Sequence, residues 1–199
     1  MTMGSKPAHI FYFDRAQARQ MVGDAPGALA DYNACLEHKD DFAPAYSNRG
    51  ALYFAHDELE AALQDFDQAI ALQPDLAAPY VGRGNVWRRL GDTGRALADY
   101  NAALARQNDL VEAYYQRGTL RREQNALPQA QDDFEQVLRR NPDYVPAYLA
   151  RGYVAYQLGD LAAALADYET YLALGGGERY GHAEAIQSRI DRLRAQLGQ

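Results

Sequence analysis

Apolar and polar residues alternate along most of the chain with the spacing of amphipathic helices, and short turns interrupt the pattern. Two of these turns carry the same three residues, Leu-Gly-Asp, at 90–92 and at 158–160. Glycine ends a helix by adopting the left-handed conformation, and aspartate starts the next helix by accepting hydrogen bonds from its free N–H groups. The pattern therefore predicts helix pairs with tight turns at Gly91–Asp92 and Gly159–Asp160.

The predicted helix pairs repeat every 34 residues. An Arg-Gly dipeptide recurs with this period, at 49–50, 83–84, 117–118 and 151–152, and a tyrosine stands three residues before each arginine. The same phase carried back reaches Tyr12 and Arg15, where Ala16 replaces the glycine. The second half of each unit repeats an alanine and, four residues later, an aromatic residue: Ala28 and Tyr32, Ala62 and Phe66, Ala96 and Tyr100, Ala130 and Phe134, Ala164 and Tyr168.

Five units in register predict a repeat array with a segment at each end. Residues 1–8 form an N-terminal tail of the kind that an expression vector leaves, and residues 179–199 follow the last unit. The predicted units are 9–42, which is divergent, 43–76, 77–110, 111–144 and 145–178.

The repeated pattern resembles that of the tetratricopeptide repeat family: aromatic, two residues, large residue, glycine, then alanine, three residues, aromatic, and finally proline. The second unit shows it best, with Tyr46, Arg49, Gly50, Tyr53, Ala62, Phe66 and Pro74. The third unit departs from it at Asn108, where proline is expected, and the fifth ends in three glycines at 175–177. The resemblance spans residues 9–178 and implies an all-α, right-handed α-solenoid of antiparallel helix pairs with a concave groove.

The Gly-Arg-Gly stretch at 82–84 raises two interpretations, a phosphate-binding loop or a structural element. Its second glycine recurs in every later unit in the middle of a predicted helix, where glycine destabilises by about 0.5–1 kcal/mol relative to alanine, so a compensating close contact is expected. We therefore interpret Gly50, Gly84, Gly118 and Gly152 as structural. We expect each to face the small alanine of its partner helix, which is Ala62, Ala96, Ala130 or Ala164.

An aspartate follows each recurring arginine by sixteen residues. With a turn centred near Gly91, Arg83 lies eight residues before the turn and Asp99 eight after it, so antiparallel helices place the two side by side. A charge facing a partner helix needs a counter-ion, and arginine's planar fork fits a carboxylate. We expect one structural ion pair in each unit: Arg15 with Asp31, Arg49 with Asp65, Arg83 with Asp99, Arg117 with Asp133, and Arg151 with Asp167.

The segment after the three glycines carries Ile186, Ile190, Leu193 and Leu197 at helical spacing. A terminal repeat exposes the apolar face that a further neighbour would cover. The pattern predicts a capping helix over the last unit's Tyr168, Tyr171 and Leu172, and the alternative is a partner-binding helix.

No residue pattern indicates catalysis, a cofactor or a metal site. His9, His38, His56 and His182 lie at scattered phases, and the single cysteine, Cys35, stands where later units have alanine, which favours a small core residue over a nucleophile. We expect a protein that is not an enzyme.

The net charge and the hydropathy of the chain limit the classes of partner that we expect. The net charge of −7 disfavours nucleic acid, and no apolar run approaches the roughly 20 residues of a membrane-spanning helix, so neither nucleic acid nor membrane insertion is expected. The expected compartment is the cytoplasm, with a trimmed signal peptide or anchor left open.

The resemblance implies a partner-binding groove lined by the first helix of each unit. Aromatic and arginine side chains are favoured anchors for protein partners, and we expect Arg88 and Arg122 to anchor an acidic or aromatic residue of a peptide. Against this, Tyr153 and Phe54 could simply pack between repeats, and the arginines could be solvated. The candidate groove residues are Phe13, Gln17, Asn48, Phe54, Val81, Asn85, Arg88, Tyr115, Arg122, Tyr153 and Tyr156.

Some chaperone adaptors of the resembling family hold a C-terminal carboxylate with lysine, arginine and asparagine side chains. The matching positions here hold Ser47, Ala51, Gly82, Glu112 and Gln116, so that ligand is not expected. The predicted function is an adaptor that binds a protein or peptide partner in the groove, as a monomer. The alternatives are a structural or self-associating module that uses its ends or convex face, and a subunit whose catalytic domain lies elsewhere.

Overall fold

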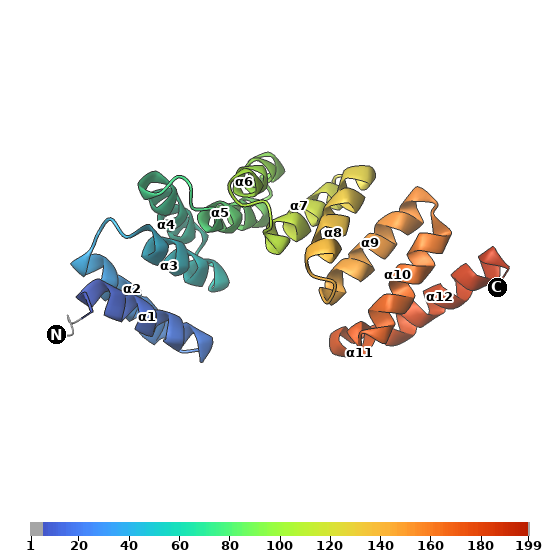
Figure 1. The fold of residues 1–199 in the computed structure, drawn as a ribbon, viewed down its shortest axis with the longest axis horizontal. Coiled ribbons are helices and arrows are strands. Elements are labelled where there is room, and N and C mark those ends of the chain that lie inside the picture. The colour runs from blue at the N-terminus through green and yellow to red at the C-terminus, as the bar shows by residue number, and fades with distance from the viewer. Residues whose placement is uncertain (1–5, 199) are drawn as a thin grey trace, which may run out of the picture. The chain divides into compact units, whose positions relative to one another are not determined.

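The computed structural model describes residues 6–198, and within that range all regular structure is α-helical (Figure 1). The chain divides into two compact units, unit 1 up to Asn108 and unit 2 from Asp109. The helices of unit 1 are α1 (Ala8–Met21), α2 (Ala25–His38), α3 (Ala43–Ala55), α4 (Leu59–Leu72), α5 (Ala78–Arg89) and α6 (Thr93–Arg106). Those of unit 2 are α7 (Val111–Glu123), α8 (Leu127–Arg140), α9 (Val145–Leu158), α10 (Leu161–Ala173), α11 (Gly176–Tyr180) and α12 (Ala183–Leu197).

Consecutive helices form antiparallel pairs, and the expected turn chemistry joins them. Gly91 and Gly159 are in the left-handed region, with φ of 81° and 84°, as expected from the sequence. The Asp92 carboxylate accepts a hydrogen bond from the Arg95 N–H at 2.9 Å, and Asp160 accepts one from the Ala163 N–H at 3.0 Å. These caps satisfy N–H groups that a helix start leaves free. The predicted all-α class with paired antiparallel helices is confirmed.

The core follows the repeated alanine and aromatic positions of the second helices. All five alanines are fully buried, and the five aromatics four residues later are 0–1% exposed. Cys35 is also fully buried, beside the second-helix core of the first pair, and burial raises the pKa of its thiol. A buried thiol with a raised pKa is a poor nucleophile, which fits a packing role.

The expected contact of each mid-helix glycine with an alanine is wrong, because the glycines instead lie against the aromatic rings. A Cβ added to Gly84 would lie 2.8 Å from Cε1 of Tyr100, and one added to Gly152 would lie 2.8 Å from Cε1 of Tyr168. Gly50 and Gly118 face Phe66 and Phe134 in the same way. A flat ring fills the space over the glycine, so the absent side chain accommodates a large neighbour rather than a small one.

Gly82 has a separate packing role, between neighbouring helix pairs. A Cβ at this position would clash with the ring of Phe66, which belongs to α4 of the preceding pair. The two glycines on either side of Arg83 therefore face the aromatic residues of two successive second helices. Both have a steric explanation that involves no phosphate.

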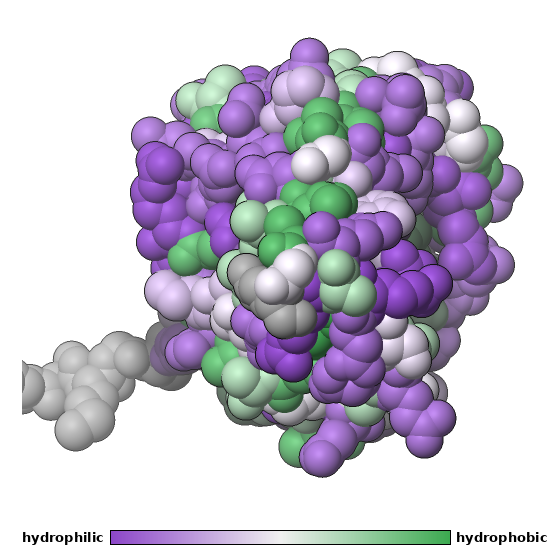
Figure 2. Space-filling view, turned by 90° about the vertical axis from the view of Figure 1, so that its right-hand side faces the viewer, coloured by the Kyte–Doolittle hydropathy of each residue, from purple (hydrophilic) through white to green (hydrophobic). Residues whose placement is uncertain are grey.

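The C-terminal helix covers the last pair as predicted. Ile186, Ile190 and Leu193 of α12 are 1–2% exposed and form one buried cluster with Tyr168 and Tyr171 of α10. Hydrophilic residues predominate on the face seen in Figure 2, which views the molecule from its C-terminal side, with hydrophobic residues in small groups among them. Across residues 6–198, no helix is both long and apolar enough to cross a membrane.

Candidate functional site

The recurring arginines and aspartates meet across each helix pair. In every pair, an arginine Nη2 lies 2.6–2.7 Å from one oxygen of its aspartate, and Nε donates a second hydrogen bond to the same carboxylate at 2.8–3.2 Å. The aspartate side chains are only 2–7% exposed, whereas the arginines are 15–42% exposed. Each pair is therefore a buried carboxylate held by a guanidinium that reaches solvent at one edge.

The tyrosine three residues before each arginine packs on the same guanidinium. The arginine Cζ lies 5.4–5.9 Å from the centre of the ring in all five pairs, within the range of a cation–π interaction. This contact explains why tyrosine and arginine recur together, a spacing that the sequence shows but does not explain.

In unit 1 the arginines also join neighbouring helix pairs, which sequence analysis missed. The third nitrogen of Arg49, Nη1, donates to Oδ1 of Asn33 at 2.6 Å, and Nη1 of Arg83 donates to Oδ1 of Asp67 at 2.6 Å. Both acceptors stand two residues after the aspartate of the preceding pair. The signal was present in the sequence, since an acceptor recurs with the 34-residue period at Asn33, Asp67, Asn101, Glu135 and Glu169.

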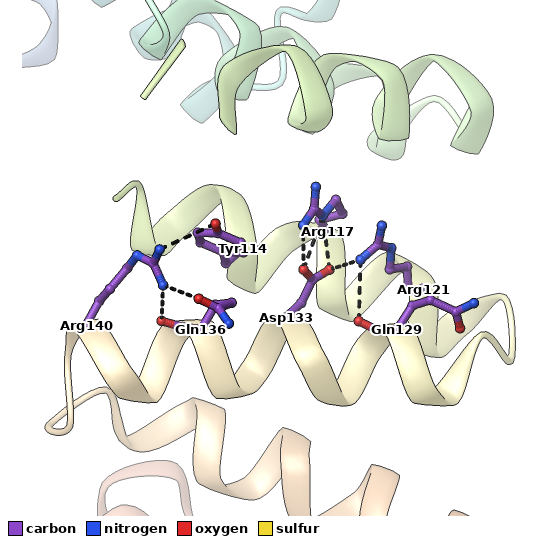
Figure 3. A network of polar contacts seen from close by, with 7 residues as sticks. All are labelled: Tyr114, Arg117, Arg121, Gln129, Asp133, Gln136 and Arg140. Carbon is purple, nitrogen blue, oxygen red and sulfur yellow. Dashed lines mark hydrogen bonds and ion pairs between the residues drawn. The ribbon is translucent and has the colours of Figure 1, made fainter. Parts of the chain in front are cut away.

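In unit 2 a second arginine joins one of the pairs (Figure 3). Arg121 of α7 places Nη1 2.8 Å from Oδ2 of Asp133, whose other oxygen is 2.7 Å from Nη2 of Arg117. The first pair of unit 1 has the same arrangement, with Arg19 3.1 Å from Asp31. The hydrogen bonds from Arg15, together with the charges of Arg15 and Arg19, hold the pKa of Asp31 below its usual value.

The candidate groove residues of unit 1 are partly engaged in the fold. The ring of Phe13 packs edge-to-face against that of Phe42, with the ring centres 5.1 Å apart. Phe54 packs on the buried cluster around Phe66. Asn85 accepts a hydrogen bond from the Tyr100 hydroxyl at 2.8 Å. Of the others, Gln17 is exposed, and those that are partly exposed are Asn48, Val81 and Arg88.

All four candidates of unit 2 line adjoining pockets. Tyr115, Arg122 and Tyr153 border a pocket of about 290 Å³, the first pocket, whose lining also includes Leu149, Tyr171, Tyr180 and His182. Arg122 and Tyr153 also border a second pocket of about 500 Å³, which is completed by Tyr156, Gln157 and Arg189. The first helices α7 and α9 thus present aromatic and cationic side chains to open space. The prediction that Arg88 and Arg122 act together as an anchor stays a prediction.

The C-terminal segment also contributes to these pockets, which the sequence pattern did not predict. Arg189 of α12 lies with its Cζ 4.9 Å from the centre of the Tyr153 ring. His182 and Tyr180 stack with Tyr171 at the first pocket, and the Tyr171 hydroxyl lies 3.1 Å from Nδ1 of His182. These residues follow the repeats, so no repeat phase could assign them to the same face as the first helices.

Tyr168 has a buried hydroxyl that makes no hydrogen bond within the described chain. In the matching positions, the Tyr32 hydroxyl donates to Oε1 of Gln20 and the Tyr100 hydroxyl donates to Oδ1 of Asn85. Tyrosines occupy both partner positions for Tyr168, namely Tyr153 and Tyr156. Tyr168 lines a third pocket of about 220 Å³ with Tyr156, Arg189, Arg192, Leu193 and Gln196.

Among the residues that the structure describes, no group of three or more histidine, cysteine, aspartate or glutamate side chains is placed to hold a metal ion. The pockets present guanidinium groups, phenol groups and aromatic faces.

Antiparallel helix pairs with a 34-residue sequence period define a helical repeat protein. Two family models described as tetratricopeptide repeat match residues 43–76 and 115–179. The chain belongs to the tetratricopeptide repeat family, whose members mediate protein–protein interactions. No curated protein sequence matches the chain.

Solved structures share this fold at low sequence identity. PilW, described as a widely conserved type IV pilus biogenesis factor, is 18% identical with a TM-score of 0.78, over 98% of this chain and 96% of PilW. PilF of Pseudomonas aeruginosa is 17% identical with a TM-score of 0.80, over 96% of this chain and 90% of that one. YrrB, a tetratricopeptide repeat protein with an unusual peptide-binding site, is 22% identical with a TM-score of 0.64, over 85% of this chain and 88% of YrrB.

Proposed function

We propose that this protein is an adaptor that binds a peptide or protein partner on the first-helix face of its helix pairs and carries out no catalysis itself. The observation that carries the proposal is the set of adjoining pockets in unit 2, which α7 and α9 line with Tyr115, Arg122, Tyr153 and Tyr156. The known roles of the family and the peptide-binding site named for YrrB support it.

The residue types at these pockets suit binding. Aromatic rings bury a large area with little loss of side-chain entropy, and arginine pairs with carboxylate or carbonyl oxygens. Arg122 and Arg189 form no ion pair within residues 6–198, whereas the repeated arginines are engaged with aspartates. Their guanidinium groups therefore have capacity for a partner.

The proposal is tested by capture of partners with the full chain, followed by competition with short peptides from the captured proteins. For an identified partner, we expect Arg122→Ala and Tyr156→Ala to weaken binding. Arg179→Ala removes an exposed charge of α11 that lines none of these pockets, and we expect it to leave binding unchanged. The double variant Arg88→Ala, Arg122→Ala tests the predicted joint anchor. Wild-type affinity in all of these variants would contradict binding on this face.

The alternative function, a module that self-associates through an end, also has an observation in its favour. Three apolar side chains of the first helix and its turn are exposed: Phe11 at 51%, Met21 at 88% and Val22 at 81%. Light scattering after size-exclusion chromatography separates the two functions. A monomer at every concentration would count against self-association, and a dimer that Met21→Ser dissociates would favour it.

A further inference from the structure

We propose that the pockets around Arg189 bind an acidic side chain of the partner peptide, with Arg122, Arg189 and the Tyr168 hydroxyl as its ligands. This inference rests on the proposed function and assigns the chemistry that the site selects. It differs from the capture of a chain terminus, because the bound group is the side chain of an internal residue and not the C-terminal carboxylate.

The first observation is the unpaired hydroxyl of Tyr168. A buried hydroxyl without a hydrogen bond is destabilising, so a position that keeps one without a partner in the described chain is a candidate for binding a ligand. Phenylalanine stands at the matching position of two other helix pairs, Phe66 and Phe134, so the fold accepts a ring without the hydroxyl. Burial raises the pKa of Tyr168, which keeps the hydroxyl protonated and able to donate.

The second observation is the charge of the pocket linings. Arg122 and Arg189 border the second pocket, and Arg189 and Arg192 border the third, while neither lining contains a carboxylate. The chain as a whole has a net charge of −7, whereas the only charged side chains that line these two adjoining pockets are arginines. A carboxylate would accept hydrogen bonds from both guanidinium groups, and such charge-assisted bonds are stronger than neutral ones.

The arrangement of the pockets favours a side chain over a chain terminus. The second pocket shares Arg122 and Tyr153 with the first, and Tyr156 and Arg189 with the third, so it lies between them. An acidic side chain at Arg189, where the second and third pockets meet, lies between Arg122 of the second pocket and Tyr168 of the third. The peptide can then continue over the second pocket towards the first. The first pocket, lined by Leu149, Tyr171 and Tyr180 among others, suits a neighbouring apolar side chain.

Selection from a library of random peptides, displayed with fixed spacers on both sides, tests the inference on the full chain. We expect enriched peptides to carry aspartate or glutamate beside an apolar residue. Replacing that acid by its amide should weaken binding about tenfold, because a charge-assisted hydrogen bond to a guanidinium is stronger than a neutral one. The double variant Arg122→Gln, Arg189→Gln should lose the acidic preference, and Arg179→Gln, the matched control, should keep it.

Tyr168→Phe supplies a second variant. It removes only the hydroxyl oxygen, which makes no hydrogen bond within the described chain. We expect it to weaken the enriched acidic peptide about threefold to tenfold while the melting temperature does not fall, because no bond within the chain is lost. A purely structural role of Tyr168 would leave peptide binding unchanged.

Three results would overturn the inference while leaving the proposed function in place: enriched peptides without acids, equal binding of acid and amide peptides, or enrichment only from a second library with free C-terminal carboxylates. Failure of both libraries to yield any binding peptide would contradict peptide binding on this face, and the inference with it.

Discussion

Replacing Arg83 with leucine removes the only cation that the described chain places on the buried Asp99 carboxylate. Asp99 accepts hydrogen bonds from Nε at 2.9 Å and from Nη2 at 2.7 Å, and its side chain is 7% exposed. Removing one partner of a buried ion pair leaves an uncompensated charge, which destabilises by about 3–5 kcal/mol. Because Arg83 is 22% exposed and water can partly replace it, we expect a loss of about 3 kcal/mol.

The reverse change should be milder. In Asp99→Leu the guanidinium retains the Asp67 carboxylate at 2.6 Å and its solvent-exposed edge, so we expect a loss of about 1–2 kcal/mol. The double variant Arg83→Leu, Asp99→Leu replaces the pair with apolar contact, which is often neutral for buried ion pairs. It should therefore lose much less stability than the roughly 4–5 kcal/mol to which the two single losses sum.

Urea denaturation of the full chain measures these differences. Trp87, the one tryptophan, lies on α5 with Arg83 and reports unit 1 through its fluorescence, while circular dichroism reports all helices. Midpoints from both probes are compared because repeat arrays can depart from two-state unfolding. The matched control is Arg117→Leu, where Arg121 remains 2.8 Å from Asp133 and the loss should be smaller. Single losses that simply add in the double variant would refute the coupling of Arg83 and Asp99.

Deleting residues 183–199 uncovers the buried cluster on α10, and we expect faster proteolysis of the last pair and association on size-exclusion chromatography; a stable monomer would show that the last helix is not a cap. Asp31→Asn should make the stability of the fold depend less on pH in the acid range. The pKa of Asp31 is lowered in the fold, so its contribution to stability is present above about pH 4 and is lost as the pH falls. An unchanged pH profile of urea midpoints would contradict this. Tyr100→Phe breaks a hydrogen bond to Asn85 and should destabilise by about 1 kcal/mol, whereas Tyr168→Phe breaks none and should not, and thermal melting compares the two.

The repeated part of the fold could be predicted because each feature occurs several times in the chain. A single arginine near a single aspartate means little, but five at one spacing and a glycine turn midway between them specify which residues face each other. Arg83 and Asp99 could be placed side by side on this basis alone. The residue that a buried glycine faces could not be predicted in the same way. The repeat period gives the position of the glycine along its helix, but it does not show which side chain of the partner helix covers the glycine.

The parts that sequence analysis missed lie where repetition stops. Arg189 and His182 occur once, after the last unit, and their positions depend on how α12 packs against α10. Periodicity of Ile186, Ile190 and Leu193 identifies the buried stripe of that helix, but it does not say which first-helix residues the flanking Arg189 meets. The unpaired Tyr168 hydroxyl becomes visible only when three-dimensional partners are compared with those of Tyr100.

The hydrogen bonds that join one helix pair to the previous one affect how a repeat protein can gain further helix pairs in evolution. Arg49 bonds to Asn33 and Arg83 bonds to Asp67, so the α3–α4 pair carries a donor for the pair before it and an acceptor for the pair after it. At the end of the array, Arg194 of α12 donates to Glu169 at 2.7 Å and thereby occupies the last acceptor. A tandem gene duplication of one helix pair of this kind would reproduce both the donor and the acceptor, so an added copy would join its neighbours without any new mutation at the junction.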